Sequence, residues 1–68
     1  MQNQKKLVVF NVGDRITVRN AASFVGVVAG DSGKIISITE NGVRFVVNKD
    51  GESIINQTSN PSFTLIEG

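Results

Sequence analysis

The 68 residues of this chain include no cysteine, no histidine, no tryptophan and no tyrosine. Without cysteine the chain cannot form a disulfide, and without cysteine or histidine it lacks the usual ligands of zinc. The missing histidine also removes the base that most serine hydrolases use to activate their nucleophile. We therefore expect no metal, no cofactor, no small-molecule substrate and no enzymatic activity. The lack of cysteine favours a cytoplasmic location.

Aromatic side chains are scarce, since the only ones are four phenylalanines. Sites that stack single-stranded bases, enclose methylated lysine or bind proline-rich peptides need several exposed rings, so the composition disfavours all three. Alternation along the chain predicts that Phe45 and Phe63 belong to the core. Phe24 lies in a segment of uncertain structure, where a core position and an exposed anchor are both open.

A strong charge of one sign and long apolar runs are also missing. The net charge is +1, so no overall field attracts nucleic acid or an anionic membrane. The apolar run from Leu7 to Phe10 is shorter than the roughly 7–15 residues of a signal peptide. We expect no association with a membrane, and we expect residues 1–6 to form a flexible tail of a single domain that spans residues 1–68.

Valine, isoleucine and threonine are abundant, and seven glycines separate the apolar runs. In residues 15–19, Ile16 and Val18 alternate with polar residues, which predicts a strand with one buried face. Asn41-Gly42 between two apolar runs predicts a hairpin, and Lys49 to Glu52 predicts another. Further strands are predicted over residues 34–39, 43–47, 53–57 and 63–66, with an additional one over residues 7–10.

Residues 21–29 are ambiguous, because an apolar run with one glycine fits either a bulged strand or a long loop. We favour a strand from Phe24 to Val28. Five or six short antiparallel strands then predict an all-β fold and a small closed barrel, since closure removes exposed sheet edges. A core of this size supplies little stability, which makes self-association a further expectation.

The pentapeptide Gly30-Asp31-Ser32-Gly33-Lys34 contains the string found around the nucleophile of chymotrypsin-like proteases. That chemistry needs a histidine, and a pair of Ser32 with Lys34 has no visible oxyanion hole. A phosphate-binding loop needs a glycine where Val28 stands and a serine or threonine where Ile35 stands. The pentapeptide therefore predicts a turn that precedes a strand.

Residues 12–18, VGDRITV, and the later residues 30–38, GDSGKIISI, together resemble the KOW motif of ribosomal proteins and transcription elongation factors. With the hairpin that follows, the resemblance covers residues 12–48. It implies an SH3-like barrel of five strongly bent strands and a nucleic-acid ligand. The loop after Val18 is longer than in that family, and Ala29 replaces a residue that is often basic.

Type II dihydrofolate reductases are similar over Gly13-Asp14-Arg15, but their Val-Gln-Ile-Tyr strand is absent.

Two functions of a non-enzymatic module follow from these observations. The first is protein–protein interaction or assembly in a bacterial or phage setting, with a different protein or a second copy as partner. Its expected contacts lie in the apolar segment, at Phe24, Val25 and Val27. The second is binding of RNA or DNA through a basic patch, and its expected contacts are Arg15, Arg19, Lys34, Arg44 and Lys49. An oligomeric enzyme with a site between subunits is the third and weakest alternative.

Overall fold

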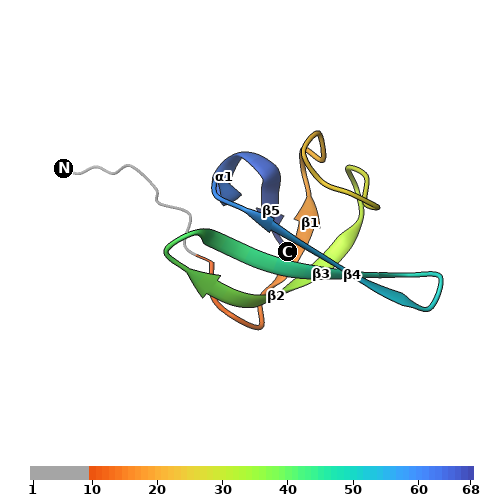
Figure 1. Cartoon of the computed structure of the whole chain (residues 1–68), viewed down its shortest axis with the longest axis horizontal. Coiled ribbons are helices and arrows are strands. Elements are labelled where there is room, and N and C mark those ends of the chain that lie inside the picture. Colours follow the sequence, from red (N-terminus) through yellow and green to blue (C-terminus); the bar gives the residue numbers. More distant parts are fainter. Residues whose placement is uncertain (1–9) are drawn as a thin grey trace.

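The computed structural model describes residues 10–68, so the predicted tail and most of the predicted strand at residues 7–10 lie outside the described residues. Phe10 itself belongs to no strand. The described chain contains five strands and one short helix, and no helix in it is long and apolar enough to span a membrane (Figure 1). The elements are β1 (Arg15–Val18), β2 (Ser32–Thr39), β3 (Gly42–Lys49), β4 (Glu52–Thr58), α1 (Pro61–Thr64) and β5 (Leu65–Glu67).

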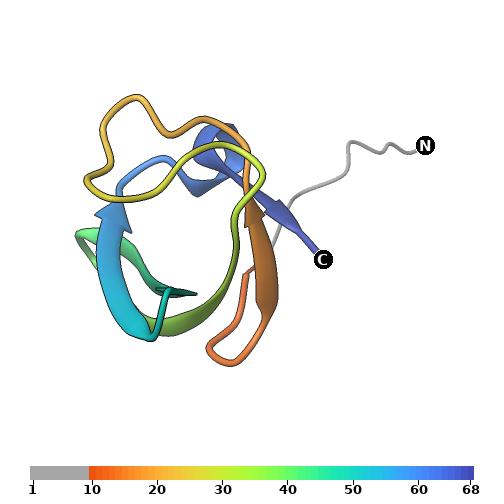
Figure 2. The same ribbon diagram turned by 90° about the vertical axis from the view of Figure 1, so that its right-hand side faces the viewer.

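All five strands form one antiparallel sheet in the order β4-β3-β2-β1-β5, which confirms the all-β class. The sheet curves strongly around the core (Figure 2). Strands β4 and β5 do not pair with each other, so the prediction of a closed barrel is wrong. The residues from Arg19 to Asp31, which we name the long loop, cover the core beside β4 instead.

Two tight hairpins connect the central strands, as the sequence predicts. Between β3 and β4, Asp50 and Gly51 both have positive φ, 51° and 79°, the geometry of a type I′ turn that matches the twist of the strands. Between β2 and β3, Gly42 has a φ of 127° and lies against the carbonyl oxygen of Thr58. One register shift, between Ile35 and Ser37, places a β-bulge in β2, where such bulges bend strands.

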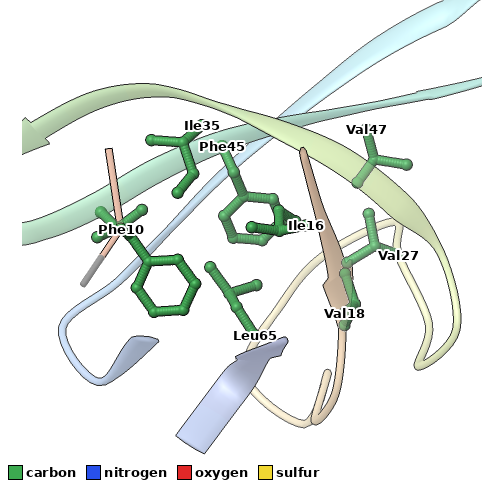
Figure 3. Close-up of a cluster of buried hydrophobic side chains, with 9 residues drawn as sticks. Phe10, Ile16, Val18, Val27, Ile35, Phe45, Val47 and Leu65 are labelled. Carbon is green, nitrogen blue, oxygen red and sulfur yellow. The ribbon is translucent and has the colours of Figure 1, made fainter. Parts of the chain in front are cut away.

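The core lies on the inner face of the curved sheet and centres on Phe45, which is 0% exposed (Figure 3). The alternation in β1 is confirmed, because Ile16 and Val18 are buried and Arg15 is exposed. Phe24 is half-buried, and its ring meets that of Phe45 edge to face at a centroid distance of 5.0 Å. The other buried apolar residues are Phe10, Val27, Ile35, Val43, Val47 and Leu65.

One predicted strand is absent, and another is only partly observed, because Leu65 and Ile66 lie in β5 but Phe63 and Thr64 do not. Phe24 to Val28 belong to the long loop, where Phe24 N–H donates to the carbonyl of Ala21 and no partner strand is available. At residues 63–66 a short helical turn precedes β5, because Pro61 starts α1 with a fixed φ suited to a first helical position. A helix rotates each residue by about 100° instead of alternating faces, so Phe63 is 56% exposed and its predicted core position is wrong.

The glycine-flanked pentapeptide at residues 30–34 is only partly a turn. Gly30 lies in a turn with a φ of 99°, closed by the bond from Asp31 N–H to the Val28 carbonyl. Ser32 and Gly33 already belong to β2. A Cβ on Gly33 would lie 2.5 Å from the carbonyl oxygen of Val46, so this glycine permits a close approach of β2 and β3.

Candidate functional site

A hollow with two cations lies on the outer face of the sheet, across β1, β2 and β3. Arg15 stands opposite Lys34 in the register of β1 and β2, both side chains are exposed, and neither forms an ion pair with any residue from 10 to 68. We name this the basic hollow. It has a volume of about 470 Å³ and is lined by Gly13, Arg15, Ser32, Gly33, Lys34, Val46 and Asn48. Two cations with a hydroxyl and an amide suit an anionic group such as phosphate.

The other three predicted basic residues do not line this hollow. Arg19 donates to the carbonyl of Ser62 at 3.3 Å, and Arg44 donates to Oε1 of Gln57 at 3.4 Å. Lys49 pairs with Asp31, with 3.0 Å between Nζ and Oδ2. The structure therefore brings together two of the five predicted cations, and contacts within the domain engage the others.

Asp31 joins the long loop to β3. Its Oδ2 accepts a bond of 2.9 Å from Val28 N–H in addition to the contact with Lys49. The Val28 N–H, and after it the Lys49 side chain, lower the pKa of this carboxyl because both favour its charged form.

Asp31 should therefore stabilise the folded state at pH values above about 3.9, the pKa of an aspartate carboxyl in the unfolded chain. This stabilisation should be lost as the pH falls through the lower pKa that the Asp31 carboxyl has in the folded state. We expect Asp31→Asn to be less stable than wild type at pH 7, and the difference to shrink below about pH 4. Urea unfolding from pH 7 to pH 2 measures this. The control Glu52→Gln leaves both Asp31 contacts intact. A difference that persists unchanged to pH 2 would contradict the assignment.

A second hollow lies between the long loop, the end of β4 and α1. It has a volume of about 550 Å³, and no charged residue lines it. We name this the neutral hollow. Its lining residues are Asn20, Ala22, Ser23, Phe24, Gln57, Thr58, Ser59, Asn60, Phe63 and Thr64. It therefore combines two aromatic rings with several amides and hydroxyls.

Local hydrogen bonds fix the walls of the neutral hollow. The N–H groups of Arg19 and Asn20 donate to the Thr64 carbonyl at 2.7 and 3.2 Å, which ties the base of the long loop to the end of α1. The buried hydroxyl of Thr64 donates to that of Thr58 at 2.9 Å, which ties α1 to β4. The hollow is thus preformed, so a ligand would not have to order it.

The three predicted protein-contact residues differ in position. Phe24 is half-buried against the core and also lines the neutral hollow, whereas Val27 is 5% exposed and belongs to the core. Val25 is 79% exposed. The Asn56 side chain holds Val25 in place, since it accepts from Val25 N–H at 3.2 Å and donates to the Val25 carbonyl at 3.0 Å.

Asn56→Ala should release the long loop from β4, because it removes both bonds to Val25 at once. We expect a loss of about 1–2 kcal/mol in unfolding free energy. We also expect the substitution to raise the hydrogen-exchange rate of the Val25 amide more than it raises the rates of amides in β1. Exchange measured by NMR tests this, with Ser53→Ala on the same strand as the control. An unchanged exchange rate at Val25 would show that packing alone holds the loop.

Sequence reasoning missed most of the neutral hollow, above all Phe63. The signal that was available is Asn60-Pro61, because proline at a first helical position favours a helical turn over a strand. The amides of Asn20, Gln57 and Asn60 gave no signal, since they converge only through folding.

No protein-family model matches the chain, and no curated protein or solved structure is significantly similar to it. Within residues 10–68, no three or more acidic side chains gather closely enough to hold a metal ion. We therefore infer a function from the geometry of the two hollows.

Proposed function

We propose that this protein is a non-enzymatic, cytoplasmic module that binds a segment of another protein in the neutral hollow. The observation that carries the proposal is an exposed phenylalanine, Phe63, at the wall of an uncharged hollow. Large aromatic side chains at the edge of a concave surface are typical anchors of protein interfaces.

The lining of the neutral hollow suits a peptide backbone. The amides of Asn20, Gln57 and Asn60 each offer donors and an acceptor, so they can pair with both N–H and C=O groups of an extended segment. Phe24 adds apolar surface between them. The absence of charge among the lining residues disfavours phosphate or carboxylate as the main recognised group.

Cross-linking of partner proteins in cells, compared between wild type and the variant Phe63→Ser, tests the proposal. Phe63 is largely exposed, so the variant should fold like wild type. Ile36→Ser, which removes an exposed apolar side chain from β2, is the matched control. We expect proteins that cross-link to wild type and to Ile36→Ser in cells to be lost with Phe63→Ser. Retention of every partner by a folded Phe63→Ser variant would refute the neutral hollow as the site.

Nucleic-acid binding at the basic hollow is the second candidate. The facing cations Arg15 and Lys34 support it, as does the resemblance to the KOW motif, which also implies that the curved sheet is an SH3-like barrel. The small number of cations in the basic hollow argues against nucleic-acid binding, because each phosphate contact contributes only part of the affinity.

Salt dependence separates the two candidates. If nucleic acid is the ligand, the affinity for a single-stranded oligonucleotide should fall with salt, and Lys34→Ala should reduce the slope by about 0.7 per lost phosphate contact. Arg19→Ala is the control, because Arg19 bonds to Ser62 and lies outside the basic hollow. An absence of binding at low salt would exclude this candidate.

A further inference from the structure

The free edge of β4 offers unpaired backbone groups at alternate residues. The two-residue turn at Asp50 and Gly51 closes at the pair Lys49 and Glu52, and in such a hairpin this pair exchanges both hydrogen bonds. Bonded and non-bonded pairs then alternate along the regular register with β3. Ser53, Ile55 and Gln57 fall at the non-bonded positions, so their N–H and C=O groups face outward.

No backbone group of Ser53, Ile55 or Gln57 has a hydrogen-bond partner among residues 10–68. The three residues are exposed. The edge groups are therefore open to water or to another chain.

This edge also lacks the usual protection against pairing. Natural edge strands are blocked by lysine, proline, a bulge, a very short length, or a covering helix or loop. Strand β4 has seven residues, ESIINQT, with no lysine and no proline, and its register with β3 shows no shift. The long loop bonds the Asn56 side chain of β4 and leaves the outward backbone groups of the strand without a partner among residues 10–68. The opposite edge differs, because β5 has only three residues.

We infer that β4 pairs with β4 of a second copy, antiparallel, about a two-fold axis at Ile55. In this register Ile55 lies opposite its symmetry mate, and Ser53 lies opposite Gln57, so every outward backbone group on both copies is paired. Glu52, the only charged residue of the strand, lies opposite Thr58 and meets no like charge.

The strand is self-complementary about Ile55, which favours a second copy over an unrelated partner. Its outer face places the exposed Ile55 beside the half-buried Val46 of β3, so two copies would join their apolar pairs across the axis. The small core of a domain of this length gives such pairing a clear benefit in stability. This inference rests on the backbone of β4 and not on a ligand in the neutral hollow, although Gln57 also lines that hollow.

Single cysteines test the register, because the chain has none of its own. Facing residues in a bonded antiparallel pair have Cα atoms about 5.5 Å apart, within the range that a disulfide spans. We expect Ile55→Cys to form a covalent dimer on mild oxidation of the full chain. Ser53→Cys should not do so, since its symmetry mate lies four residues along the strand, about 14 Å away. Mixed Ser53→Cys and Gln57→Cys proteins should cross-link with each other.

Sedimentation across micromolar to millimolar concentrations gives the matching solution result. Wild type and Ile66→Lys, a control on the exposed face of β5, should dimerise, whereas Ile55→Lys should remain a folded monomer. A monomeric wild type at every concentration would overturn the inference. So would a dimer that Ile55→Lys leaves intact, or cross-linking of Ser53→Cys as efficient as that of Ile55→Cys. None of these outcomes bears on partner capture by Phe63, so this inference and the proposed function fail separately.

Discussion

Phe45→Ala is expected to leave the chain largely unfolded at room temperature. Phe45 is fully buried at the centre of the core, and the ring of Phe24 packs on it edge to face. Removing a buried phenylalanine costs about 3–5 kcal/mol, through lost burial and the cavity that remains. A core of this size rarely supplies more than about 3–5 kcal/mol in total, so the two quantities are of similar size.

Urea unfolding followed by circular dichroism measures this effect, with Phe63→Ala as the matched control. Phe63 is 56% exposed, and we expect its replacement to change the unfolding free energy by less than about 1 kcal/mol. Equal losses for the two variants would contradict the assignment of Phe45 to the core and Phe63 to the surface.

Gly42→Ala should be the most damaging of the glycine substitutions at the two hairpins. Its φ of 127° is one that residues with a side chain rarely adopt, and its Cβ would overlap the carbonyl oxygen of Thr58. Because that oxygen belongs to the backbone of β4, the strand itself must shift. We expect a loss of more than about 2 kcal/mol, from backbone strain and a distorted hairpin together.

Gly51→Ala separates the steric part of this effect from the conformational part. Gly51 also has a positive φ, 79°, but a Cβ there would meet no atom within 4 Å. We expect a loss of about 1 kcal/mol, the cost of the left-handed conformation alone. The comparison uses thermal unfolding of both variants. A loss for Gly51→Ala as large as that for Gly42→Ala would show that contact with Thr58 is not the deciding factor.

The hairpins and the inner face of the sheet could be predicted from sequence because their signals are local. Alternation placed Ile16 and Val18 inside. Asn41-Gly42 indicated the first hairpin, although its turn lies at residues 40 and 41 and Gly42 begins β3, and Asp50-Gly51 form the turn of the second hairpin. Each of these signals depends on residues within one strand or one turn, where backbone geometry decides the outcome.

Long-range contacts decided the features that sequence reasoning missed. The segment around Phe24 is apolar enough for a strand, but bonds from Asn56, far along the chain, hold it as a loop. The edge of β4 stays unpaired because β5 does not reach it, and the long loop bonds the Asn56 side chain of β4, not the backbone of that edge. Phe63 was misplaced because one helical turn breaks the alternation on which its assignment depended.

The basic hollow was predicted from sequence only in part, and the neutral hollow was largely missed. Arg15 and Lys34 were both identified from their polar positions, and the register of β1 and β2 places them opposite each other. The remaining predicted cations are separated from them by contacts such as that of Lys49 with Asp31. The neutral hollow gathers residues from the long loop, β4 and α1, and no local pattern marks such a convergence.

Photo-cross-linking from position 63 tests most directly that the neutral hollow binds another protein. Phe63 is replaced by a benzoyl-phenylalanine that keeps an aromatic ring at the exposed position, and Ile36 is replaced in the same way as a control on β2. After irradiation in cells, we predict protein adducts from position 63 that are absent from position 36. Adducts at position 63 that contain only nucleic acid, or the same protein adducts from both positions, would contradict the proposed function.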